Sequence, residues 1–155
     1  MNRIRLERKL KRRRSKKRPP LKFAFWQDWG TYDNQSLVCV GLDRDDVLSH
    51  AKRLNAKRWF IEWLRDDPEV QEFFNNSQLG GFFGHHRGAS ILWLKEFRDE
   101  WPFYETLMHE LHHAVFYLLE GNNGMHAEME AQAYQQGFLF RQIRRRFQKR
   151  LGILA

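Results

Sequence analysis

The stretch His109-Glu110-Leu111-His112-His113 says more about the fold of this chain than any other part of the sequence. The dipeptide Trp101-Pro102 before it is a helix start signal, and the segment Gly121-Asn122-Asn123-Gly124 after it is a stop signal. The sequence therefore predicts one helix from Trp101 to about Glu120. In such a helix His109 and His113 are four residues apart and project from the same face.

This H-E-x-x-H pattern has the residue types and the spacing of a catalytic metal site. Two imidazoles one helical turn apart can hold a single Zn²⁺ at about 2.0–2.1 Å each. Glu110 is next to the first histidine, where its carboxylate can act as general base on a metal-held water without being a ligand. Such a site has three protein ligands, and the candidates for the third are His126, Glu128 and Glu130.

Helical period separates the two glutamates. The short connection at 121–124 predicts that a last helix, from about Met125 toward Arg150, is an antiparallel neighbour of the first. Glu128 and Glu130 are two positions apart, so they cannot both point at one site. We expect Glu130 to lie on the inward face of this helix, which it shares with Ala133, Tyr134, Phe138 and Leu139. We expect Glu128 to lie on the solvent-facing side, with Gln132, Gln135 and Gln136. We therefore predict Glu130 as the third ligand.

The rest of the chain predicts an α+β fold with a small mixed sheet. Residues 22–26 and 37–40 have the pattern of a strand hairpin, and residues 89–94 that of a further strand. Helices are expected from Asp43 or Asp45 to about Leu54, over 57–64, and again from Pro68. The glycine-rich stretch 80–88, with His85-His86-Arg87 inside it, predicts a loop.

Length and composition limit the kind of protein. A chain of 155 residues with 13 Phe and 6 Trp is long and aromatic enough for one domain with a real core, which we place at 21–155. A single cysteine, Cys39, excludes an internal disulfide and a cysteine-based zinc ribbon. No apolar run approaches the ~20 residues of a membrane span, and no secretory signal is recognisable. We expect a soluble, cytoplasmic protein with no membrane contact.

Charge is strongly uneven along the sequence. Residues 1–22 contain 12 Lys or Arg and one acid, and residues 141–150 contain 6 basic residues and no acid. The body between them, 23–140, contains 9 basic and 18 acidic residues. Residues 1–20 therefore predict a disordered basic arm, and residues 3–18 could contact nucleic acid through its charge without reading sequence.

The stretch His109 to His113, followed by Glu130-Ala131-Gln132-Ala133-Tyr134, resembles the gluzincin metallopeptidases, in particular small zinc peptidase-like proteins of phages and mobile elements. The resemblance covers roughly 89–143 and implies a zincin-like domain in which residues 89–94 form the edge strand that pairs with an extended peptide. It implies zinc bound by His109, His113 and Glu130, with Glu110 as general base. Thermolysin-like members have an Asp where this chain has Tyr134.

A weaker resemblance is to the SprT-like, DNA-associated zinc proteases, whose third ligand is a histidine; His126 would have that role here. The expected function is hydrolysis of a protein or peptide substrate, in the host cytoplasm if the chain is phage-encoded. Tyr134, His85 and His86 are candidates for stabilising an oxyanion. The alternative is a nucleic-acid-associated binding protein in which the zincin core is an inactive scaffold and the basic ends bind.

Overall fold

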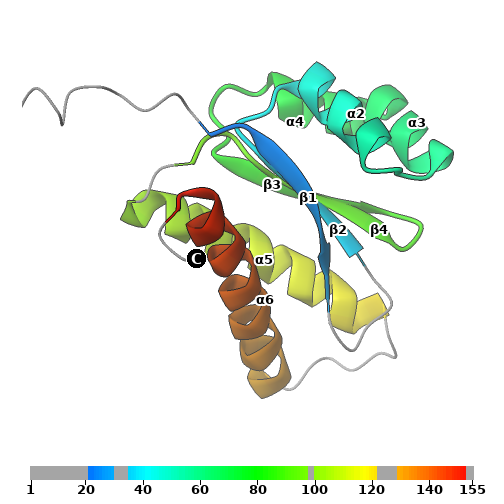
Figure 1. Cartoon of the computed structure of the whole chain (residues 1–155). Helices are drawn as coiled ribbons and strands as arrows, with labels where there is room; N and C mark the ends of the chain where they lie inside the picture. Colours follow the sequence, from blue (N-terminus) through cyan, green and yellow to red (C-terminus); the bar gives the residue numbers. More distant parts are fainter. Residues whose placement is uncertain (1–20, 30–34, 98–99, 122–128, 153–155) are drawn as a thin grey trace, which may run out of the picture.

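The computed structural model describes residues 21–29, 35–97, 100–121 and 129–152, which form three layers (Figure 1). In chain order the elements are β1 (Phe23–Asp28), β2 (Gln35–Val40), α2 (Arg44–Arg53), α3 (Arg58–Asp66), α4 (Pro68–Asn75), β3 (Gly81–His86), β4 (Ala89–Leu94), α5 (Trp101–Gly121) and α6 (Met129–Arg150). Helices α2, α3 and α4 cover one face of the sheet, and α5 and α6 cover the other. The predicted α+β class with a small mixed sheet is confirmed.

The sheet has the strand order β1-β2-β4-β3. Strands β2 and β4 are parallel in the centre, while β1 and β3 are antiparallel to their neighbours at the two edges. Side chains alternate between two cores, so that Val38 and Leu92 face α5 and α6 whereas Leu37 and Ile91 face α2 to α4. The expectation that residues 89–94 form an edge strand is therefore wrong, because β4 is paired on both sides.

The edge strand beside α5 is β3, where the sequence predicted a loop. Its turn to β4 has only two residues, Arg87 at φ 47° and Gly88 at φ 79°, and two left-handed residues are what a tight type I′ hairpin requires. Phe82 packs into the core under α2 to α4, and Phe83 packs on the opposite core. The glycines thus belong to a strand and its turn.

The predicted helix starts in the first half are confirmed. Asp43 caps α2 by accepting a 2.8 Å hydrogen bond from the main-chain N of Asp46. Asp67 caps α4 by accepting from the main-chain N atoms of Glu69 and Val70, and Pro68 is the first helical residue. Both caps satisfy N–H groups that have no partner within the helix.

Helix α5 confirms the predicted span from Trp101, and it packs with α6 on the sheet. The α5 residues Leu107, Leu111 and Ala114 and the α6 residues Leu139 and Phe147 are buried in the shared core. The predicted start of the last helix at Met125 lies outside the described residues. None of the described helices combines the length and apolarity that crossing a membrane requires.

The face assignment that separated Glu130 from Glu128 is confirmed for Phe138 and Leu139, which lie against or in the core, but it is wrong for the turn of α6 before them. Tyr134, expected inward, is 72% exposed. Gln135 and Gln136, expected in solvent, donate hydrogen bonds of 2.9 and 2.8 Å to the main-chain oxygens of Trp29 and Met108. These two amides are half-buried, and each joins α6 to another element through a main-chain oxygen, at the end of β1 and in α5.

Candidate metal and catalytic site

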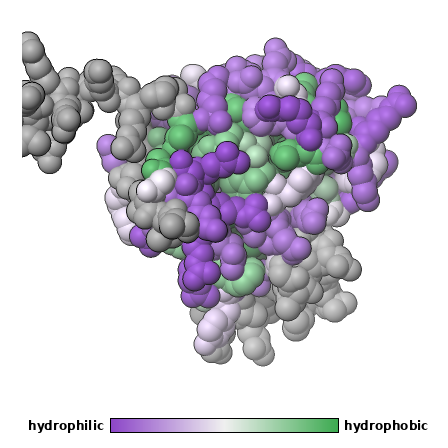
Figure 2. Space-filling model, viewed as in Figure 1, coloured by the Kyte–Doolittle hydropathy of each residue, from purple (hydrophilic) through white to green (hydrophobic). Residues whose placement is uncertain are grey.

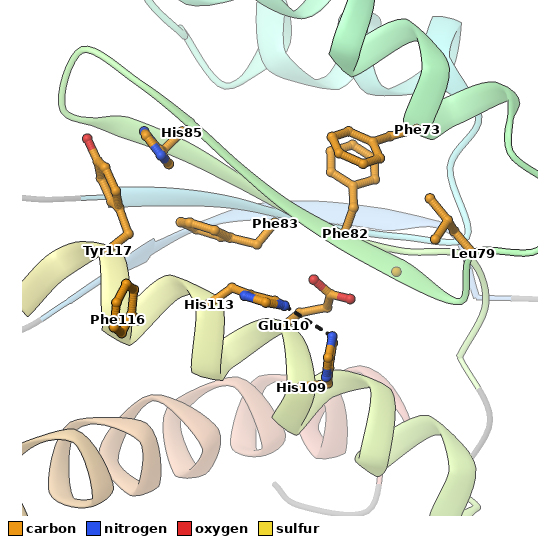
Figure 3. Close-up of a pocket in the computed structure, with 11 residues that line it drawn as sticks. Phe73, Leu79, Phe82, Phe83, His85, His109, Glu110, His113, Phe116 and Tyr117 are labelled. Carbon is orange, nitrogen blue, oxygen red and sulfur yellow. Dashed lines mark hydrogen bonds between the residues drawn. The ribbon is translucent and has the colours of Figure 1, made fainter. Parts of the chain in front are cut away.

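The two predicted histidine ligands lie side by side on α5. The Nε2 atoms of His109 and His113 are 3.1 Å apart, and their rings are nearly perpendicular (Figure 3). Both residues are exposed, as is His112 between them. Partial desolvation of its ring is the main cause that lowers the pKa of His113 below its usual value, and the neighbouring His109 and His112 lower it further. A lowered pKa favours the neutral imidazole, which is the form that binds metal ions.

Glu110 differs from its neighbours because it is almost completely buried, with 7% of its surface exposed. Burial raises the pKa of its carboxyl group, while nearby His109 and a hydrogen bond from the main chain of Phe83 oppose that rise. The carboxyl group therefore lies between α5 and the edge strand β3, beside the two imidazoles (Figure 3). A desolvated carboxylate at that place is suited to accept a proton.

His109, Glu110 and His113 line a cleft of about 480 Å³ that runs along β3. Its lining joins the three α5 residues to a mostly aromatic wall, formed by Phe73, Leu79, Gly81, Phe82, Phe83, His85, Phe116 and Tyr117. The main-chain N–H of Lys95 donates to the main-chain oxygen of Gly80, so the main-chain groups of Gly80 point toward β4. In an antiparallel pair the N–H and C=O groups of successive residues point alternately toward the partner strand and away from it. The main-chain groups of Gly81, Phe83 and His85 consequently point away from β4, at the open edge that borders the cleft.

The candidates for stabilising an oxyanion are separated by the fold. His85 lines the cleft and stacks on Tyr117, with ring centroids 3.3 Å apart. His86 is on the opposite face of β3, stacked on Trp63. Tyr134 is exposed on α6 and is not among the residues that line this cleft. Of the three, only His85 belongs to the site.

Sequence reasoning missed two residues of the site, Phe83 and Tyr117. Tyr117 is four positions after His113, so helical spacing could have placed it on the same side of α5. Phe83 had no such signal, because its strand was predicted as a loop; it lines the cleft, and its main chain donates to Glu110. Phe116, also on the cleft wall, is 49% exposed.

The third ligand stays a prediction. Glu130 lies in the first turn of α6, but its side chain is outside what the structure describes, and His126 and Glu128 lie in the segment 122–128 that is not described. Within the described part of the chain, no three His, Cys, Asp or Glu side chains are placed together so that they could hold a metal ion.

Comparisons with protein-family models, with curated proteins and with solved structures found no match to this chain.

Proposed function

We propose that this chain is a zinc-dependent hydrolase of peptide bonds, in which His109 and His113 bind the metal, Glu130 completes the ligand set and Glu110 is the general base. The observation that carries the proposal is the pair of Nε2 atoms 3.1 Å apart beside a buried carboxyl group. We propose the cytoplasm as its place of action.

The histidine pair fits a zinc ion closely. Two nitrogen ligands about 2.05 Å from a tetrahedral zinc ion are separated by about 3.3 Å. The separation of 3.1 Å therefore needs only a small opening of the pair. A similar pair could also form one imidazole–imidazole hydrogen bond, but that bond gives no reason for a desolvated carboxyl group at their side.

The roles of the residues follow from their positions. Zinc, when bound, polarises a scissile carbonyl and makes a coordinated water more acidic. Glu110 takes the proton of the attacking water and passes it to the leaving amine, so that a single carboxyl group acts first as base and then as acid. The main-chain N–H of Phe83 holds that carboxyl group in place. His85 is at the cleft wall, where a protonated or neutral N–H can face developing negative charge.

The substrate we propose is an extended segment of a protein or peptide. The outward main-chain groups of Gly81 and His85 lie along the cleft and can pair with a strand added at the β3 edge. The apolar wall formed by Phe83, Phe116 and Tyr117 favours an apolar side chain beside the cleavage point.

The test combines metal content with catalysis. The full chain is purified with and without added zinc, and zinc per chain is measured by elemental analysis. We expect about one zinc per chain, and we expect His109→Ala and His113→Ala to weaken binding at least ~100-fold, since losing a group that only supports a ligand costs ~10–100-fold. Glu110→Gln should keep zinc and lower the hydrolysis of unfolded casein and mixed peptides by about 10²–10⁴.

The matched control is His112→Ala, which removes an exposed imidazole from the same turn of α5 without touching the Nε2 pair. It should keep both zinc and activity. Zinc bound equally well by the wild type and His109→Ala would refute the metal site. Hydrolysis unchanged in Glu110→Gln would refute the catalytic role. Comparison of Glu130→Ala, Glu128→Ala and His126→Ala by zinc affinity identifies the third ligand, and we expect only Glu130→Ala to match the histidine variants.

A further inference from the structure

The C-terminal half of α6 has one apolar face and one basic face. Leu139, Ile143 and Phe147 are each 1% exposed in the core. All six cations of this half are exposed, namely Arg141, Arg144, Arg145, Arg146, Lys149 and Arg150. No acidic residue occurs in the sequence from 131 to 150. Figure 2, in the same view as Figure 1, shows hydrophilic surface around an apolar area at the centre of the view.

These cations are ordered in a regular row. Arg141, Arg145 and Lys149 follow one another at four-residue intervals, so they rise in steps of about 6 Å along about 12 Å of helix. Arg144 flanks the row over the ring of Tyr104 at 5.9 Å. On the other flank, Arg146 donates a 2.8 Å hydrogen bond to the main-chain oxygen of Trp26. The flanking arginines are held by the fold, and the row between them points outward.

The fold joins this basic face to the second basic segment of the sequence. Strand β1 starts at Phe23, whose ring lies 5.6 Å from that of Phe147 and 5.5 Å from the guanidinium carbon of Arg150. The 22 residues that precede Phe23 contain 12 Lys or Arg. The first described strand therefore starts at the C-terminal end of the α6 row (Figure 1), and in the sequence it directly follows the basic segment 1–22.

We propose that the row Arg141, Arg145 and Lys149 with its flanking arginines is a binding surface for the phosphate backbone of nucleic acid, without sequence preference. A nucleic acid strand repeats one negative charge about every 3.4 Å of its axis, and a straight row of cations matches such a regular polyanion. Guanidinium groups bind phosphate in a bidentate manner. A row of cations contacts the phosphates, which are the same whatever the base sequence, so contacts to the backbone dominate.

Two other polyanions fit this face less well. A helix that binds a membrane surface needs exposed apolar side chains beside its cations, and Leu139, Ile143 and Phe147, which lie in this half of α6, are buried in the core. An acidic protein presents carboxylates at irregular spacing, which a regular row does not select. The continuation of positive charge into residues 1–22 favours a long, uniformly charged partner.

This surface is remote from the candidate catalytic cleft. It adjoins β1, at one edge of the sheet, whereas the cleft borders β3, at the opposite edge. Nucleic acid bound along α6 therefore leaves the cleft open. The proposal extends the contact expected from the sequence for residues 3–18 to a surface of the folded domain, and it holds whether or not the zinc hydrolase proposal is correct.

The test measures binding of labelled 25-nucleotide single strands and 25-base-pair duplexes of two unrelated sequences, by fluorescence anisotropy between 50 and 200 mM salt. The variants, all in the full chain, are R141A/R145A/K149A on α6 and R12A/R13A/R14A in the N-terminal segment. The matched control is K52A/R53A/K57A, which removes three exposed cations from the α2–α3 side of the sheet. Thermal unfolding checks that each variant is folded.

We expect the α6 variant to weaken duplex binding at 100 mM salt at least about 10-fold and to reduce the slope of log K against log salt by about 2–3, since each phosphate contact contributes ~0.9. The arm variant should give a further, additive loss, the control should change neither quantity, and one duplex should bind per chain. Equal losses in the control and the α6 variant would overturn the proposal, as would an unchanged slope in the α6 variant. Tighter binding to anionic vesicles or poly-glutamate at the same salt would overturn the assignment to nucleic acid.

Discussion

Phe147 is the residue that fixes the C-terminal half of α6 to the rest of the molecule, and replacing it by alanine should be severely destabilising. Its side chain is 1% exposed. Its ring contacts four others, with centroid separations of 5.6 Å to Phe23, 6.4 Å to Phe25, 5.4 Å to Phe97 and 5.6 Å to Phe103. These partners come from β1, from the segment before α5 and from α5 itself, so one ring connects α6 with the sheet and with the candidate catalytic helix.

The expected loss can be estimated from that burial. Truncating a buried Phe to Ala costs about 3–5 kcal/mol, and four edge-on or tilted aromatic contacts place Phe147 in the upper part of that range. Domains of this kind unfold with about 5–15 kcal/mol, so Phe147→Ala removes a large fraction of the stability. At a urea dependence of about 2 kcal/mol per M, the unfolding midpoint should fall by roughly 2 M.

The assay is equilibrium urea unfolding followed by far-UV circular dichroism, with two controls. Tyr134→Ala removes an aromatic side chain from the same helix at a position that is 72% exposed, and it should change the free energy of unfolding by less than about 0.5 kcal/mol. Phe147→Leu keeps most of the buried apolar volume but loses the ring contacts, and it should cost clearly less than Phe147→Ala. A loss below about 1 kcal/mol in Phe147→Ala, or an equal loss in Tyr134→Ala, would refute this account of how α6 is held.

Three further predictions concern other parts of the molecule. Gly81→Ala should destabilise the protein by about 1–3 kcal/mol in urea unfolding and reduce its zinc affinity, because an added Cβ would lie 2.9 Å from a main-chain oxygen of β4 and 3.1 Å from Thr106 on α5. Gly137→Ala is the control: an added Cβ there has nothing within 4 Å, and it should stabilise the protein by about 0.5–1 kcal/mol. Cys39 is fully buried, and burial raises the pKa of its thiol. A thiol reagent at pH 8 should therefore label the native protein only as fast as it unfolds, and in denaturant it should label one thiol per chain at once. Asp67→Ala should cost about 1 kcal/mol in urea unfolding through loss of the α4 cap, and an unchanged midpoint would contradict the capping role.

Local signals in the sequence predicted most of the elements. The cap at Asp43, the Asp67-Pro68 start and the span of α5 from Trp101 are each determined by a few neighbouring residues, and the structure confirms them. The two strands of the first hairpin were also predicted, the first from the alternating pattern of residues 22–26 and the second from the short apolar run at 37–40. Such features depend on contacts within one or two turns of chain.

The features that the sequence did not predict depend on contacts between distant segments. Glycines at 80–88 indicated a loop, yet Gly81 lies where a side chain would collide with β4, and Gly84 lies against Trp63. The parallel pairing of β2 with β4 joins segments some fifty residues apart and has no local signature. Gln135 and Gln136 are half-buried and donate hydrogen bonds to main-chain oxygens of other elements, which their polarity alone did not indicate.

The two edges of the sheet differ in which side chains contact their main-chain groups, and this difference connects the fold with the proposed functions. At the β1 edge, α6 supplies Arg146, which donates to the main-chain oxygen of Trp26. At the β3 edge, α5 supplies Glu110, which accepts from the main chain of Phe83, while the outward groups of Gly81 and His85 lie along the cleft. An open strand edge exposes a protein to unwanted pairing. The open edge beside a desolvated carboxyl group and two imidazoles is therefore the place where we propose that a peptide strand pairs with β3.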